Sequence, residues 1–119
     1  MLKTDVLVIG AGAVGTAITR ELTKYNLDVI CVDKNDDVGG DCSKSNSAII
    51  HTGYDAAPGT LESELVVAAN PRYDQLCKDL DIPFSRIGAI LPAITEEQFE
   101  QLPAIKEKAL KNRVYDIEY

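Results

Sequence analysis

The chain has 119 residues, of which 45% are hydrophobic, and this matches one ordinary globular domain with a modest core. Its net charge of −7 argues against nucleic acid or an anionic membrane as a partner, because both favour a basic surface. The apolar runs are too short for a transmembrane segment, and the run at residues 6–9 is too short for the core of a signal peptide.

The first part of the chain is predicted to fold as strand, helix and strand. Asp5–Ile9 is a nearly continuous apolar run, typical of a strand buried on both faces of a parallel sheet. Ala13–Lys24 has a helical period, and Val29–Val32 is a second buried strand that ends at Asp33. The apolar face of this helix comprises Val14, Ala17, Ile18 and Leu22. Together these elements predict one right-handed βαβ unit.

Turn-forming residues dominate 35–47, and a helical period returns from Leu61. Asn70 and Pro71 interrupt this period, and they are expected to restart a helix with Asn70 as the N-cap and Pro71 at the first helical position. The restarted helix has apolar residues at i, i+3, i+4 and i+7, which predict a buried stripe of Tyr73, Leu76, Cys77 and Leu80.

Short β-like pieces at 84–86 and 89–91 flank Gly88. Residues 95–98 have a capping-box sequence that opens a short helix, and Pro103 is expected to start another that ends near Asn112. Residues 114–119 alternate like a strand with no evident partner, which suggests a truncated chain. We therefore expect residues 1–82 to belong to a nucleotide-binding domain and 83–119 to begin an incomplete α+β domain.

The cysteines are Cys31, Cys42 and Cys77, which are odd in number and widely spaced. This pattern fits neither a disulfide framework nor a metal site, and it indicates a reducing compartment such as the cytoplasm. Cys31 and Cys77 are interpreted as small core residues.

The segment Gly10–Gly15 is a GxGxxG motif between a buried strand and an amphipathic helix, the context in which the motif binds a dinucleotide. Gly10 permits the tight turn, Gly12 lets the backbone approach a pyrophosphate, and Gly15 allows the helix to pack on the strand. Ala13 and Val14 lie at the helix N-terminus, where free N–H groups attract phosphate. A turn that binds nothing is the structural alternative.

Asp33 lies 18 residues after Gly15, at the end of the second strand. A carboxylate there can accept hydrogen bonds from the hydroxyls of an adenosine ribose, and it repels a 2′-phosphate. Lys34 beside it weakens that repulsion slightly. An aspartate exposed at a loop edge is the structural alternative.

The residues after Asp33 favour FAD over NAD. A NAD-binding fold usually continues into another crossover helix, whereas this chain runs into a glycine pair followed by small hydroxyl and amide side chains. Such a segment can pack its backbone against an extended ligand and hydrogen-bond the phosphates and ribityl chain. A flexible surface loop is the alternative. The residues concerned are Gly39, Gly40, Ser43, Ser45, Asn46 and Ser47.

These motifs, together with the stretch Ser45-Asn46-Ser47-x-x-x-His51-x-Gly53-Tyr54, resemble the D-amino-acid-oxidase-like superfamily of flavoproteins. The sequence is most similar to the branch of glycerol-3-phosphate dehydrogenases and L-2-hydroxyglutarate oxidases. The resemblance covers nearly the whole chain, because it continues through Pro58–Leu61, Asn70, Tyr73, Leu76, Cys77, Leu80, Pro83, Phe84, Arg86 and Gly88. The sequence departs from the family pattern at Asp33, where the family usually has glutamate. Pro71 and Arg113 are also unusual for the family.

The resemblance implies an FAD-dependent oxidoreductase that acts on the CH–OH group of glycerol 3-phosphate or a small hydroxy acid. It places His51 near the flavin, as a proton-accepting catalytic residue and cofactor contact or as a covalent attachment point, whereas a packed structural histidine is the bland alternative. The resemblance also implies that Tyr54 and Arg86 belong to the site wall, and the alternatives are a half-buried tyrosine and a solvated arginine at a strand end. Family members are several times longer, so the chain alone is expected to be inactive and to self-associate or require a complementing chain. The rival functions are a NAD(P)-binding module and a nucleotide-binding fragment without catalysis.

Overall fold

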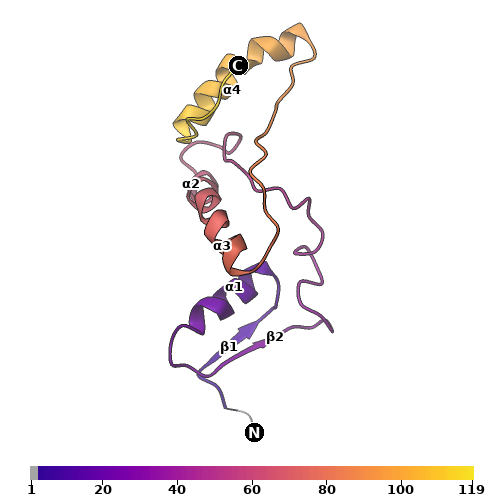
Figure 1. Cartoon of the computed structure of the whole chain (residues 1–119), viewed down its shortest axis with the longest axis vertical. Helices are drawn as coiled ribbons and strands as arrows, with labels where there is room; N and C mark the ends of the chain where they lie inside the picture. The colour runs from indigo at the N-terminus through magenta and orange to yellow at the C-terminus, as the bar shows by residue number, and fades with distance from the viewer. Residues whose placement is uncertain (1–2) are drawn as a thin grey trace. The chain divides into compact units, whose positions relative to one another are not determined.

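The computed structural model describes residues 3–119, and the residues up to Ile49 form one compact unit. Two strands, β1 (Val6–Ile9) and β2 (Val29–Val32), pair in parallel with Val6 opposite Val29. Helix α1 (Ala13–Leu22) connects the strands and packs against both (Figure 1). The predicted βαβ arrangement is confirmed, and the helix ends before the predicted Lys24.

The apolar side chains of this first unit remain largely exposed. Ile9 is 81% exposed and Leu7 51%, so the prediction that the strands are buried on both faces is wrong for this unit. Helix α1, all of which is described, contains no buried residue, and Val14 and Ile18 on its apolar face are exposed. Two strands and one helix provide too few neighbours to cover both faces of a parallel sheet.

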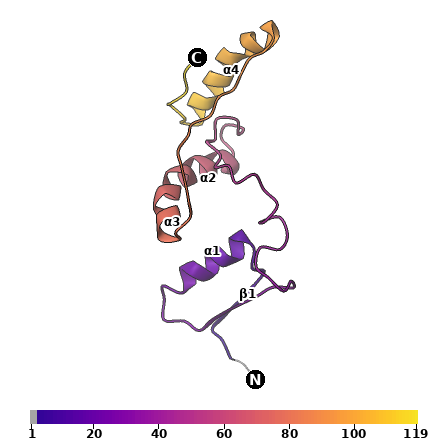
Figure 2. The same ribbon diagram turned by 45° about the vertical axis from the view of Figure 1, so that its right-hand side comes forward.

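Residues 50–119 form the second compact unit, which is helical. Helix α2 (Leu61–Ala69) is capped by Thr60, and a 3₁₀ turn η1 (Asn70–Arg72) joins it to α3 (Tyr73–Asp79) (Figure 2). The predicted N-cap role of Asn70 is wrong, because Asn70 is the C-cap of α2. Its side-chain amide forms hydrogen bonds with His51 and Arg86 instead.

The predicted stripe of α3 is only partly buried. Cys77 is 7% exposed, as expected, whereas Leu80 at the end of the helix is 47% exposed. The chain turns sharply there because Asp81 adopts a left-handed φ of 53°, which lets the N–H of Ile82 donate to the Cys77 carbonyl at 2.8 Å. Leu80 therefore lies on the last turn of the helix, where the chain turns away and leaves its side chain exposed.

Helix α4 (Glu96–Lys111) opens with the predicted capping box, in which Thr95 and Gln98 bond each other's backbone N–H groups. The prediction that Pro103 begins a separate helix is wrong, because Pro103 lies inside α4. Proline lacks the N–H that would reach the Phe99 carbonyl, and Phe99 is exposed, so water can satisfy that carbonyl. One helix therefore continues through the proline.

In the described part of the chain, residues 84–86, 89–91 and 114–119 are not strands. Their prediction as β-like pieces is wrong, because no neighbouring strand pairs with them there. The compact units divide after Ile49, and the domain boundary expected after residue 82 stays a prediction. None of the helices within residues 3–119 is long and apolar enough to cross a membrane.

Candidate functional site

The glycine turn joins β1 to α1 through very close backbone packing. Gly10 has a φ of 107°, and its N–H donates to the Val32 carbonyl at 2.7 Å, which ties the turn to the end of β2. A Cβ on Gly15 would lie 1.8 Å from the Gly10 carbonyl oxygen, so only glycine allows α1 to start this close to the strand. The geometry matches the tasks expected of the first and third glycines.

A backbone N–H group at the N-terminus of α1 donates a hydrogen bond to a side chain of the loop that follows β2. Gly12 is the N-cap and has no side chain, so the N–H of Ala13 donates instead to Oγ of Ser43 at 2.8 Å. A Cβ on Gly12 would lie 3.0 Å from the same Oγ. The Ser43 hydroxyl accepts from Ala13 while keeping its own proton, which it can donate to an anion. Val14, next in the helix, is exposed.

Asp33 follows β2 and lies beside the glycine turn. Its carboxylate accepts from the N–H of Ala11 at 2.6 Å, and from the N–H and Nδ2 of Asn35 at 2.9 and 3.0 Å. The backbone N–H groups of Asn35 and Ala11 lower the pKa of Asp33, so the carboxylate is ionised at neutral pH. A carboxylate can accept about four hydrogen bonds, so acceptor capacity remains for a ligand hydroxyl.

The glycine pair and the loop after it are held by contacts within the first unit. The N–H of Gly39 donates to the Ala11 carbonyl at 2.9 Å, which holds the loop against the glycine turn. A Cβ on Gly40 would meet Nδ2 of Asn35 at 3.1 Å, so Gly40 makes room for that side chain. Sequence reasoning missed Asn35, since an asparagine in a polar loop has no distinguishing pattern.

The charged groups of this loop pair mainly with one another. Lys34 lies 3.1 Å from Asp41, and Lys44 lies 2.6 Å from Asp37, whose pKa is lowered by the lysine. The loop is braced further by Asn46, whose Nδ2 donates to the Ser43 carbonyl at 2.8 Å. Ser45 and Ser47 lie exposed in the same loop.

His51 lies in the second unit, whereas the other predicted cofactor residues lie in the first. Its side chain is exposed, and its carbonyl accepts from Nδ2 of Asn70 at 3.0 Å. His51 also lines a small cavity of about 210 Å³, together with Gly53, Asp55, Ala56, Ala57, Glu62 and Val66. The structure thus brings together the glycine turn, Asp33, the glycine pair and Ser43.

Arg86, expected in the site wall, is held by a dense polar cluster in the second unit. Its Nε donates to one oxygen of Asp74 at 2.9 Å, and its Nη2 donates to the other at 2.6 Å. Nη1 donates to Oδ1 of Asn70 at 2.9 Å. The guanidinium lowers the pKa of Asp74, as expected for a direct ion pair. The guanidinium is thus committed to its neighbours in the chain.

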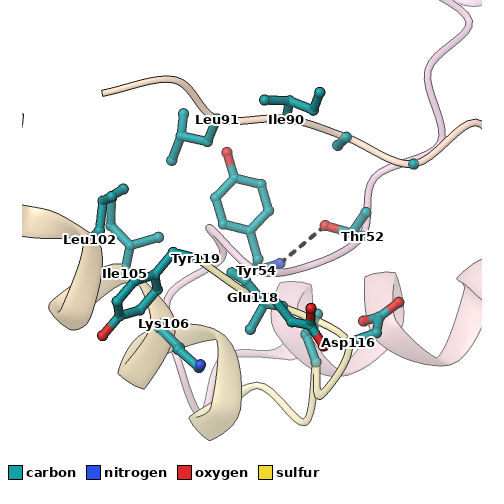
Figure 3. A pocket seen from close by; sticks show the side chains of 14 residues that line it. Thr52, Tyr54, Ile90, Leu91, Leu102, Ile105, Lys106, Asp116, Glu118 and Tyr119 are labelled. Carbon is teal, nitrogen blue, oxygen red and sulfur yellow. Dashed lines mark hydrogen bonds between the residues drawn. The ribbon is translucent and has the colours of Figure 1, made fainter. Parts of the chain in front are cut away.

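A larger cavity of about 490 Å³ lies elsewhere in the second unit. The ring of Tyr54 points into it toward Leu91, and Leu102 and Ile105 of α4 line another side (Figure 3). Local sequence patterns do not predict this cavity, because its walls come from segments that are far apart in the chain.

The model of the DAO family, described as FAD dependent oxidoreductase, matches residues 5–118. The glycerol 3-phosphate dehydrogenase of Caloramator mitchellensis is 44% identical over 113 residues, which are 95% of this chain and 24% of that protein. The glycerol 3-phosphate oxidase of Mycoplasma genitalium is 32% identical over 115 residues, 96% of this chain and 30% of that protein. The mitochondrial L-2-hydroxyglutarate dehydrogenase of Dictyostelium discoideum is 30% identical, over 95% of this chain and 26% of that protein.

Among solved structures, dithionite-reduced L-alpha-glycerophosphate oxidase from Mycoplasma pneumoniae with FAD bound matches with a TM-score of 0.83 and 29% identity. The match covers 98% of this chain and 30% of that chain. The chain therefore spans less than a third of the length of these relatives. The α/β fold and the family resemblance inferred from the motifs are confirmed: the chain belongs to the DAO family of FAD-dependent oxidoreductases.

Proposed function

We propose that the first unit holds the adenosine diphosphate half of FAD. The observation that carries this proposal is the contact between Asp33 and the Ala11 N–H at 2.6 Å, because it places a ribose-binding carboxylate beside the phosphate-binding turn. The N–H of Ala13 and the hydroxyl of Ser43 lie where the turn meets a helix N-terminus, and they suit a diphosphate. The residues present therefore fit the cofactor of the family.

Helix and backbone donors, rather than lysine side chains, are proposed to neutralise the diphosphate. Lys34 and Lys44 are both paired with loop aspartates, so neither is needed to explain phosphate binding. The proposed contacts comprise Gly10, Gly12, Ala13, Val14, Gly15, Asp33, Lys34, Gly39, Gly40, Ser43, Ser45, Asn46, Ser47 and His51. Lys34, Ser45 and Ser47 belong to this set through the family resemblance and their place in the loop.

The proposed reaction is oxidation of a CH–OH group, with glycerol 3-phosphate as the first substrate to test and 2-hydroxyglutarate as the second. Glycerol 3-phosphate is placed first because the glycerol 3-phosphate dehydrogenase is 44% identical to this chain. The L-2-hydroxyglutarate dehydrogenase is 30% identical. When bound, FAD supplies the hydride acceptor. His51, the only histidine, is proposed to accept the hydroxyl proton.

We expect the protein to act in a reducing cytoplasm, because its three cysteines are free. The exposed Ile9 and Val14 suggest that the chain covers its apolar surface by self-association or with a complementing chain. Light scattering over a range of protein concentrations tests this expectation, since a mass that stays monomeric at every concentration would contradict it.

Titration of the apoprotein with FAD tests the cofactor proposal. Gly12→Val puts a side chain where the diphosphate is expected, so FAD affinity should fall by at least about tenfold while the apo fold survives. Asp33→Ala should weaken FAD, and Asp33→Glu should preserve or improve its binding. Asp36→Ala is the matched control, because Asp36 is a nearby exposed aspartate outside the proposed contacts. Equal FAD affinity for all these variants would refute the site, and tighter binding of NAD than FAD would favour a NAD(P)-binding module.

Dye reduction with each substrate tests the reaction, and it is measured on the chain together with a complementing chain, because the chain alone is expected to reduce no dye even with added FAD. We expect glycerol 3-phosphate to reduce the flavin, and His51→Gln to slow reduction by about 10²–10⁴-fold, the usual contribution of a general base. An unchanged rate of flavin reduction in His51→Gln would contradict the catalytic role of His51. It would not contradict the proposal that the first unit binds FAD. Faster reduction by 2-hydroxyglutarate would exchange the order of the two substrates.

A further inference from the structure

The segment that carries His51 is held by side chains along its whole length. The carbonyl of His51 accepts from Asn70, and the carbonyls of Gly53 and Ala56 both accept from Nδ2 of Asn112 at 2.8 Å. Between them, the Asp55 carbonyl accepts from Nζ of Lys108 at 2.5 Å. Four carbonyls within residues 51–56 are thus bound by groups far away in the sequence.

This segment also packs tightly against α2. Gly53 has a φ of 90°, and a Cβ there would lie 2.6 Å from Cγ2 of Val67. Asn112 is only 4% exposed, and its Oδ1 accepts from the buried hydroxyl of Ser63 at 2.8 Å. Gly53 and Ala56 are therefore held by buried contacts and Asp55 by an exposed one, and the exposed end of the segment at His51 depends on Asn70.

The orientation of the Asn70 amide follows from its two neighbours. An arginine side chain only donates hydrogen bonds, so the Asn70 oxygen must face Nη1 of Arg86. The nitrogen then faces the His51 carbonyl, which only accepts. Arg86 is held in turn by Asp74 at two positions. A side-chain amide can accept from the Arg86 guanidinium through its oxygen and donate to the His51 carbonyl through its nitrogen.

We propose that Asn70 is a positioning residue for His51, oriented by Arg86 and Asp74, and that it holds the histidine backbone in one place for proton transfer. The proposal rests on the proposed catalytic role of His51. Catalysis depends steeply on placement, and displacing a reacting group by about 1 Å can cost about 100-fold in rate.

The decisive variant is Asn70→Asp. It keeps an oxygen for Arg86 but replaces the donor to the His51 carbonyl with an acceptor, so it breaks one contact of the pair selectively. Asn26→Asp makes the same chemical change at an exposed position in the first unit and serves as the matched control. Chymotrypsin cleavage after Tyr54, next to the His51 contact, should be at least about tenfold faster in Asn70→Asp and unchanged in Asn26→Asp. Equal cleavage rates in both variants would overturn the proposal.

A double-mutant cycle with His51→Gln separates positioning from general structural damage. In the complemented enzyme, Asn70→Asp should lower kcat by about 10- to 100-fold, with a smaller change in KM, when His51 is present. It should have no further effect in the His51→Gln background, because the group that it positions is gone. Additive losses would overturn the positioning role. If His51→Gln alone changes nothing, the proposed role of His51 fails, and the proteolysis experiment still decides whether Asn70 holds the segment.

Discussion

Gly15 packs so closely on Gly10 that a Cβ at residue 15 would lie 1.8 Å from the Gly10 carbonyl oxygen. The nearest atom is backbone at the end of β1, so it cannot move aside as a flexible side chain would. Gly15 is therefore required for folding of the βαβ unit before any ligand binds.

Gly15→Ala should lower the free energy of unfolding by about 3 kcal/mol, at the upper end of the usual cost of overpacking. Gly12→Ala is the control, because its Cβ would meet only the side-chain oxygen of Ser43, at 3.0 Å in an exposed loop. Urea unfolding of the two apoproteins measures the difference. Equal unfolding midpoints would contradict the packing seen between Gly15 and Gly10.

The lowered pKa of Asp33 predicts a loss of stability in acid. The ionised carboxylate is stabilised in the folded state by the N–H groups of Asn35 and Ala11. This contribution is fully present above the ordinary aspartate pKa of 3.8 and is lost as the pH falls through the lower folded value. Melting curves of the protein and Asp33→Asn should therefore differ at pH 6 and converge in acid. A difference that is constant with pH would show that Asp33 does not titrate in this way.

Asn112 should be important for the stability of the second unit. Asn112→Ala leaves the carbonyls of Gly53 and Ala56 and the hydroxyl of Ser63 without their partner. An unsatisfied buried polar group costs about 1–3 kcal/mol, so we expect a total loss of roughly 3 kcal/mol in chemical denaturation. The exposed Asn26→Ala should change stability by less than about 0.5 kcal/mol. Similar losses in both variants would contradict the buried role.

Arg113 occupies a backbone conformation that favours glycine. Its φ is 64°, its N–H donates to the Leu110 carbonyl, and the N–H of Val114 donates to the Ala109 carbonyl, which together end α4. Arg113→Gly should raise the free energy of unfolding by about 0.5–1 kcal/mol, because glycine adopts this φ without steric cost. Thermal melting measures the gain. Arg113→Ala should bring no such gain, and an equal gain would show that side-chain loss rather than the backbone is responsible.

Local patterns in the sequence predicted the strands, the helix and the glycine turn of the first unit. The apolar runs of β1 and β2, the helical period of α1 and the glycine spacing are properties of neighbouring residues, so they can be read without a structure. The place of Asp33 also followed, because the carboxyl ends of parallel strands meet at one edge of a sheet. The β-like pieces after Pro83 failed because a strand needs a partner, which a local pattern does not reveal.

The sequence by itself thus determined the βαβ unit, the glycine turn and the acid beside it. Only the tertiary structure decided which polar groups hold the candidate site. Ser43 meets Ala13 across 30 residues, and Asn112 meets Gly53 across 59. Asparagine and serine carry no periodic signal, and their partners are mostly backbone groups that every residue possesses. Such contacts depend on the path of the folded chain. The groups that contact the segment around His51 could therefore be identified only from the three-dimensional structure.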